Sequence, residues 1–202
     1  MNRHSHNHNQ GFSLVELLIY IALSAITTTA IFQVFIVVSN SFQHQYQIAD
    51  INQDLRAAMN YLTNDLRNSC YSGRHDKAKY SSPKIGIQTT HTNATSIYFV
   101  QDLNEDLDTL DENERIRYYQ SGSTLIKKNM VTNETIVISD KITSLDFKYY
   151  DENLTQITNP SDYDKIRSIL ITLEGKTTGS ALLKRKIEKT LVSGLRIRNA
   201  GL

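Results

Sequence analysis

The feature that most constrains this chain is a long N-terminal stretch without a helix breaker. No glycine occurs between Gly11 and Gly73, and the first proline is Pro83. Because glycine and proline are the residues that most often end a helix, the sequence predicts one helix from Phe12 to about Asn68. At about 1.5 Å per residue this helix is about 85 Å long, so the rest of the chain has to fold against it.

The first part of the predicted helix, residues 12–38, is mostly apolar. About 20 apolar residues are enough to cross a bilayer, so this segment is predicted to be a transmembrane helix, although Tyr20, Ser24 and Gln33 dilute its hydrophobicity. One acidic residue, Glu16, lies near its start. A carboxylate within a membrane-length helix costs about 2.5 to 3.5 kcal/mol, so Glu16 is a candidate functional residue that needs a partner.

The junction that precedes the apolar segment is unusual. Residues 1–10 are short and polar, and the apolar run begins directly after Gly11. A secretory signal peptide has its small-residue cleavage site after an apolar stretch of about 7 to 15 residues, whereas here the only obvious small-residue junction lies before it. An ordinary signal-anchor helix with one tolerated acid is the alternative, and it leaves this junction unexplained.

The segment GFSLVE at residues 11–16, followed by an apolar helix, resembles the processing signal of type IV prepilins and of the pseudopilins of type II secretion. The resemblance implies that residues 1–11 are a leader that prepilin peptidase removes after Gly11. It also implies that Phe12 becomes an N-methylated N-terminus and that Glu16 becomes the fifth mature residue. The implied location is the inner membrane, with the C-terminal domain in the periplasm until assembly into a pilus or pseudopilus.

The charges at this junction fit the implied role. Cleavage creates an α-amino group with a pKa near 8 at Phe12, and a cation at a helix N-terminus opposes the helix macrodipole. Glu16, one turn further on, can balance that charge within the subunit or across to a neighbour. The resemblance implies the second case, with an assembly platform and other major and minor pilins or pseudopilins as partners.

The second part of the helix, residues 39–70, is amphipathic, and its apolar stripe is predicted to pack on a downstream sheet while the first part protrudes. A coiled-coil dimer is the alternative, but Asn52 and Gln53 interrupt the stripe. Asp54 is placed on the opposite, polar face with Gln43, Gln47, Asn64 and Arg67. The stripe consists of Phe42, Tyr46, Ala49, Leu55, Met59, Leu62 and Leu66.

Residues 71–202 are predicted to form an antiparallel β domain that begins with a polar linker at 71–83. Apolar and polar residues alternate most clearly around Phe147 and Ile171. Ser121-Gly122 is typical of a hairpin tip, and no helix separates the strands, so the fold class is α+β with a long helix packed on an antiparallel sheet. The predicted strands are Lys84–Gln88, Ser96–Gln101, Arg115–Gln120, Thr124–Asn129, Thr135–Ser139, Ser144–Tyr150, Ile166–Glu174 and Leu182–Leu191.

The segments NYLTNDLRNSCY at 60–71, IRYY at 116–119, ITSLDFKY at 142–149 and IRSILI at 166–171 resemble W-type minor pilins (PilW). The order of elements is also similar to that of J-type minor pseudopilins. The resemblance implies a low-abundance pilin that is assembled into a pilus or initiates one, with a type II secretion pseudopilin as the alternative.

An acidic stretch between Gln101 and Arg115 is the only candidate ligand site. Oxygen side chains at alternating positions can present several hard ligands to one Ca²⁺ ion. The EF-hand pattern fails, because Leu107 replaces the turn glycine and Asn113 replaces the bidentate glutamate. A run of acids is more often a solvated loop, so calcium binding is the alternative here. A membrane-anchored module that binds calcium or another ligand without entering a filament is the alternative function. The candidate ligands are Asp102, Asn104, Asp106 and Asp108.

The remaining features point to no enzyme. Cys70 is the single cysteine, so it forms no intrachain disulfide, and a small buried residue is a better interpretation than a reactive thiol. Neither a phosphate loop nor a nucleophile motif is present. The formal net charge is +1, and the basic residues of 184–198 do not form a clean stripe, so nucleic-acid binding is not indicated.

Overall fold

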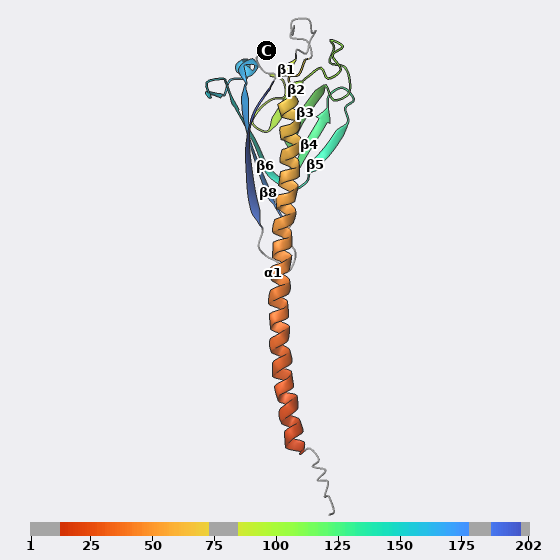
Figure 1. The fold of residues 1–202 in the computed structure, drawn as a ribbon, viewed down its shortest axis with the longest axis vertical. Helices are drawn as coiled ribbons and strands as arrows, with labels where there is room; N and C mark the ends of the chain where they lie inside the picture. Colours follow the sequence, from red (N-terminus) through yellow and green to blue (C-terminus); the bar gives the residue numbers. More distant parts are fainter. Residues whose placement is uncertain (1–12, 73–84, 178–186, 199–202) are drawn as a thin grey trace, which may run out of the picture. The chain divides into compact units, whose positions relative to one another are not determined.

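The computed structural model describes residues 13–72, 85–177 and 187–198, and the chain divides into two compact units, Met1–Gln45 and Tyr46–Leu202. A single helix, α1, runs from Leu14 to Asn68 (Figure 1). This confirms the long helix, which starts and ends within two residues of the predicted limits.

In the first unit, the helix carries large apolar side chains that nothing in the structure covers. Its apolar window has a mean hydropathy of 2.2 and no buried residue, so α1 is long and apolar enough to cross a membrane. Two of the polar residues within it are satisfied locally, because Thr27 Oγ1 donates to Leu23 O and Thr29 Oγ1 to Ala25 O, each at 2.8 Å. Such internal hydrogen bonds lower the cost of placing hydroxyl groups in lipid.

In the second unit, α1 buries a stripe that begins later than the sequence suggested. Tyr46 is 81% exposed and Ala49 is exposed as well, so placing them in the packed stripe was wrong. Phe42 belongs to the first unit, where its side chain is 67% exposed. Helical periodicity alone does not reveal where the sheets begin to cover the helix. The residues that α1 buries are Ile51, Leu55, Ala58, Met59, Leu62, Thr63 and Leu66.

The strands form two antiparallel sheets rather than the one sheet that was expected. The order of the first sheet is β1-β2-β3-β4-β5, and that of the second is β7-β6-β8-β9. The short strand β7, Gln156–Ile157, and the 3₁₀ helix Pro160–Lys165 were not predicted. The other strands are β1 Gly86–Ile87, β2 Ser96–Val100, β3 Arg115–Ser121, β4 Thr124–Asn129, β5 Thr135–Ser139, β6 Ile142–Tyr150, β8 Ser168–Lys176 and β9 Glu188–Arg196.

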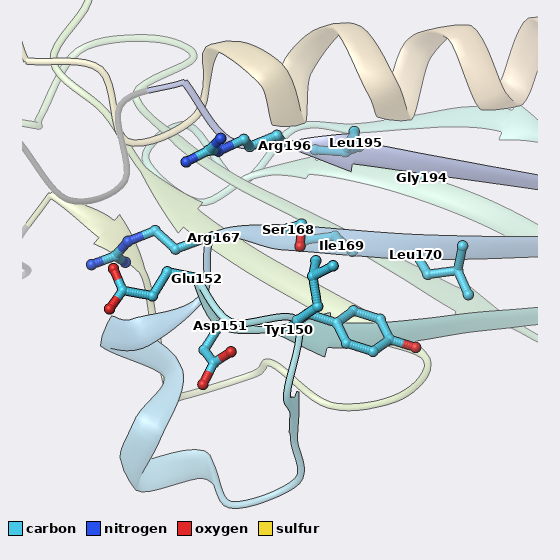
Figure 2. Close-up of a pocket in the computed structure, with 11 residues that line it drawn as sticks. Tyr150, Asp151, Glu152, Arg167, Ser168, Ile169, Leu170, Gly194, Leu195 and Arg196 are labelled. Carbon is cyan, nitrogen blue, oxygen red and sulfur yellow. The ribbon is translucent and has the colours of Figure 1, made fainter.

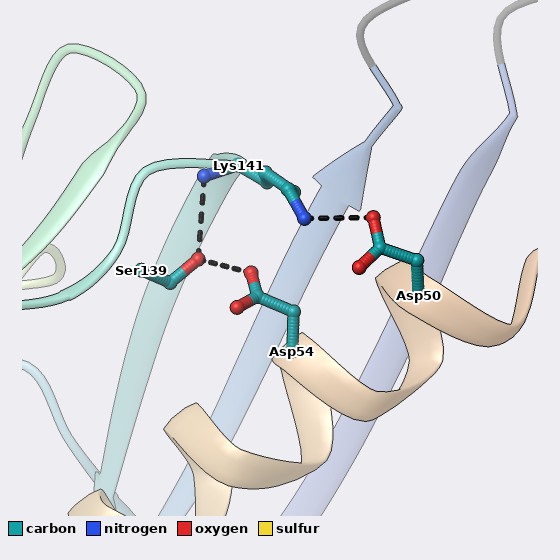
Figure 3. A network of polar contacts seen from close by, with 4 residues as sticks. All are labelled: Asp50, Asp54, Ser139 and Lys141. Atoms are coloured by element: carbon teal, nitrogen blue, oxygen red, sulfur yellow. Dashed lines mark hydrogen bonds and ion pairs between the residues drawn. The ribbon is translucent and has the colours of Figure 1, made fainter. Parts of the chain in front are cut away.

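The two sheets separate at the connection between β5 and β6. Asp140-Lys141 joins these strands, which do not pair with each other. The chain is instead held against α1, because Ser139 Oγ donates to Asp54 Oδ2 at 2.5 Å and Lys141 Nζ lies 2.8 Å from Asp50 Oδ2 (Figure 3). Asp54, which the sequence placed on the polar face of the helix, is therefore partly buried at this connection.

The pairing confirms the predicted hairpin and most of the strands. Ser121 pairs with Thr124 across a turn at Gly122, whose φ of 60° is easily adopted by glycine. The last strand differs most, since β9 covers Glu188–Arg196 where Leu182–Leu191 was expected, and 182–186 lie outside the described residues. The alternating residues of β6 and β8 are buried as expected: Leu145, Phe147, Tyr149, Ile169, Ile171 and Leu173.

Candidate functional site

Glu16 lies in the first turn of α1 and its side chain is exposed. The helix begins with a hydrogen bond from Leu17 N to Ser13 O at 3.1 Å, which places Ser13 at the N-cap and Glu16 three residues later. A carboxylate at this position stabilises the positive end of the macrodipole by about 0.3 to 1 kcal/mol. The spacing Ser-x-x-Glu is also that of a capping box, so this motif by itself could have predicted the start of the helix.

Gly11 and Phe12 lie outside the described residues, so cleavage between them and methylation of Phe12 stay predictions. The structure describes the surface of the helix that follows them in the chain. The apolar side chains of residues 14–38 are exposed on the helix, and an exposed apolar surface of this extent marks a membrane or protein contact. Lipid suits such a surface, and so do the apolar helices of neighbouring proteins.

The acidic stretch forms a loop that two buried carboxylates hold together. Asp102 is fully buried and accepts hydrogen bonds from Glu105 N at 2.6 Å and Leu107 N at 3.2 Å. Glu114 is 1% exposed and accepts from Leu103 N at 2.9 Å and from a second backbone N–H at 3.1 Å. Burial raises the pKa of Glu114, and the backbone donors oppose that rise. These two acids are therefore bound to the loop's own backbone.

Three other carboxylates of the loop lie close together. Oxygen atoms of Asp106, Asp108 and Asp111 all fall within 4.8 Å of one another. Asn104 Nδ2 donates to Asp106 Oδ2 at 3.0 Å and to Asp111 Oδ2 at 2.5 Å, so its amide bridges two of these carboxylates. Two of the predicted ligands, Asp106 and Asp108, therefore lie next to Asp111, which the alternating spacing did not predict. Asp102, another predicted ligand, does not belong to this group. Calcium binding stays a prediction.

Carboxylates on α1 attach the second half of the helix to the first sheet. Asp65 Oδ2 accepts a hydrogen bond of 2.5 Å from the Tyr118 hydroxyl and forms an ion pair of 2.7 Å with Lys127 Nζ. Burial, followed by the charge of Asp65, raises the pKa of Tyr118 far above its ordinary value. Cys70, just beyond the helix, is 3% exposed, as expected for a small buried residue.

The comparisons with known proteins concern the N-terminal segment. Residues 6–32 match the family model described as the prokaryotic N-terminal methylation motif. A search of curated proteins returned no match to this chain. The motif supports a type IV pilin-like protein, and it implies processing by prepilin peptidase and assembly with pilins. It indicates a structural subunit rather than an enzyme.

Proposed function

We propose that the chain is a minor type IV pilin of the W type, which enters or initiates a pilus after processing by prepilin peptidase. The observation that carries the proposal is the methylation motif at 6–32, which coincides with an exposed apolar helix that begins at Leu14 and has Glu16 in its first turn. Residues 12–38 anchor the subunit in the inner membrane, and residues 71–202 form its periplasmic domain.

The assembly step follows from the charges. Two opposite unit charges about 4 Å apart attract by about 4 kcal/mol at an effective dielectric constant near 20. This is comparable to the cost of about 2.5 to 3.5 kcal/mol for a carboxylate in a membrane helix. Glu16 of an incoming subunit can therefore offset its own cost by pairing with the Phe12 amine of a neighbour. Such a pair forms only after cleavage and fixes the register between the two helices.

The W-type assignment rests on the loose resemblance of 60–71, 116–119, 142–149 and 166–171, together with the order of a long helix followed by antiparallel strands. A J-type pseudopilin of type II secretion is the alternative within the same family. A W-type subunit acts in an initiation or tip complex, so it is expected in few copies per filament.

Mass spectrometry of the mature N-terminus tests the proposal. We expect a chain that begins with N-methylated Phe12. Glu16→Ala is expected to be cleaved and methylated but poorly incorporated, and wild-type chain in the same cells is the control. An intact Met1 would rule out the proposal, and normal incorporation of the Glu16 variant would rule out the pairing role.

A second candidate function is a membrane-anchored module that binds calcium. The close approach of Asp106, Asp108 and Asp111 favours it. This candidate predicts a Ca²⁺-dependent rise in melting temperature together with an unprocessed N-terminus. The two measurements separate it from a pilin, because a pilin is processed whether or not its loop binds the ion.

A further inference from the structure

The outer face of the second sheet contains a pocket of about 510 Å³ that none of the roles discussed so far uses. Its position is shown in Figure 2, where β8 and β9 form the floor and the turn after β6 forms one side. Its volume is in the range of ligand pockets. The residues that shape it are Tyr150, Leu154, Ser168, Leu170, Gly194 and Arg196.

Gly194 contributes to the pocket because it has no side chain. Gly194 pairs with Leu170 of β8, and a Cβ atom built on it meets nothing closer than Leu170 Cδ1 at 3.9 Å. A glycine inside a strand weakens the strand and often marks the close approach of a ligand or another backbone. The missing side chain therefore leaves a depression on an otherwise regular strand.

The rim of the pocket presents an apolar side chain. Leu154 is 75% exposed and has a φ of 61°, a conformation that branched residues rarely adopt. Its turn is held by Asp151, whose Oδ1 accepts from Asn153 N at 2.9 Å and from Thr155 N at 2.8 Å. The turn thus keeps an apolar residue at the mouth of the pocket instead of burying it.

The polar groups that line the pocket differ in how they are satisfied. Asp151 accepts hydrogen bonds from its own turn, and Arg167 donates to the backbone oxygens of Asp164 and Ile166. Arg196 is exposed and takes part in none of the ion pairs among the described residues. An occupant that suits Arg196 carries an acidic group next to it.

The open edge of β9 indicates what kind of occupant fits. Within residues 13–72, 85–177 and 187–198, β9 pairs only with β8, so its other edge carries free backbone donors and acceptors. Alternate residues of β9 on the outer face are Val192, which is 55% exposed, then Gly194 and Arg196. Edge strands of this kind accept an extended peptide, with backbone hydrogen bonds for affinity and alternate side chains for specificity.

We propose that β9 binds an extended segment of a partner protein as an added antiparallel strand. The segment has an acidic residue opposite Arg196, a tyrosine opposite Gly194 and an aliphatic residue opposite Val192. An aromatic side chain opposite a strand glycine lies across it and fills the missing volume. This inference does not depend on incorporation into a filament, because the site lies entirely on β6, β8, β9 and their turns.

The test uses the full chain in detergent micelles and a fluorescein-labelled peptide, acetyl-Thr-Asp-Thr-Tyr-Thr-Val-Thr-amide, followed by fluorescence anisotropy. We expect saturable binding, and we expect Arg196→Glu to weaken it about tenfold by replacing attraction with repulsion. The matched control is Arg198→Glu, which reverses the charge of an exposed arginine beyond β9 and is expected to change affinity less than about twofold. Gly194→Leu should abolish binding, because it fills the depression.

Two further peptides distinguish strand addition from a simple side-chain pocket. The first has Asp and Val exchanged, and the second carries N-methyl groups on the backbone nitrogens that would pair with β9. Both are expected to bind at least about tenfold more weakly, because they lose the register or the backbone hydrogen bonds. Equal binding of the N-methylated peptide, equal effects of the two arginine variants, or no saturable binding of the parent peptide would each overturn the proposal. Circular dichroism of every variant establishes that it is folded.

Discussion

Gly175 is a position where the second sheet approaches α1 closely, so a single methyl group there tests how the helix packs. A Cβ atom on Gly175 would lie 3.0 Å from Ile51 Cδ1, 3.1 Å from Leu55 Cδ2 and 3.1 Å from Lys141 O. The two side-chain ends can rotate away at some cost. The carbonyl cannot easily move, because it accepts a hydrogen bond of 3.1 Å from Lys176 N.

The expected effect of Gly175→Ala is the balance of two terms. Overpacking a tight site costs about 1 to 3 kcal/mol. Replacing glycine by alanine in an unstrained conformation gains about 0.4 to 1 kcal/mol by restricting the unfolded chain. We therefore expect a net loss of about 1 to 2 kcal/mol in the free energy of unfolding. For a domain of this size, that corresponds to a melting temperature lower by about 2 to 8 °C.

The assay is urea unfolding of the fragment Tyr46–Leu202, which contains every residue of the buried core. The matched control is Gly194→Ala in the neighbouring strand, where the new methyl group meets only an ordinary contact at 3.9 Å. This control is expected to be neutral or slightly stabilising. Ile51→Val removes the closest clashing atom and should recover part of the loss in Gly175→Ala.

Two results would contradict a close contact between Gly175 and α1. If Gly175→Ala is as stable as the parent fragment while its denaturant slope is unchanged, the helix does not approach the sheet as closely as the structure indicates. A loss in Gly194→Ala that equals the loss in Gly175→Ala would also contradict it, because the effect would then reflect glycine in a strand and not the contact with α1.

Three other predictions concern ionisation, assembly and metal binding. Burial raises the pKa of Tyr118 and Tyr149 above the ordinary value of 10.0, so the stability that their neutral forms provide is complete below about pH 10 and is lost as the pH rises further. Absorbance at 295 nm should show these two ionising only as the domain unfolds, and ionisation of folded protein would contradict this. Glu16→Leu should anchor in the bilayer at least as well as wild type yet fail in assembly, and incorporation measured in sheared filaments decides it. Millimolar Ca²⁺ should raise the melting temperature of the parent but not of Asp111→Asn, and an unchanged melting temperature of the parent would rule out the ion site.

The sequence predicted those features that local periodicity controls. The helix from Leu14 to Asn68 follows from the absence of glycine and proline, and its backbone hydrogen bonds join residues only four apart. The alternation around Phe147 and Ile171 predicted β6 and β8 because side chains of a strand point to opposite faces in turn. The candidate processing segment is local as well, which is why residues 11–16 were recognisable without a structure.

Other features depended on which distant segments meet. The sequence predicted one sheet, but β5 and β6 do not pair, and the strands form two sheets. Tyr46 shares the helical period of the packed stripe yet is exposed, because the sheets decide where burial begins.

The sequence by itself therefore determined the helix, the class of fold and the N-terminal methylation motif, since each rests on residues close in the chain. Only the tertiary structure decided that Asp111 joins the acidic cluster and that Gly194 lines a pocket. The physical reason is that burial and pocket shape arise from side chains brought together across strands. Their positions depend on the pairing register, and local sequence patterns do not specify that register.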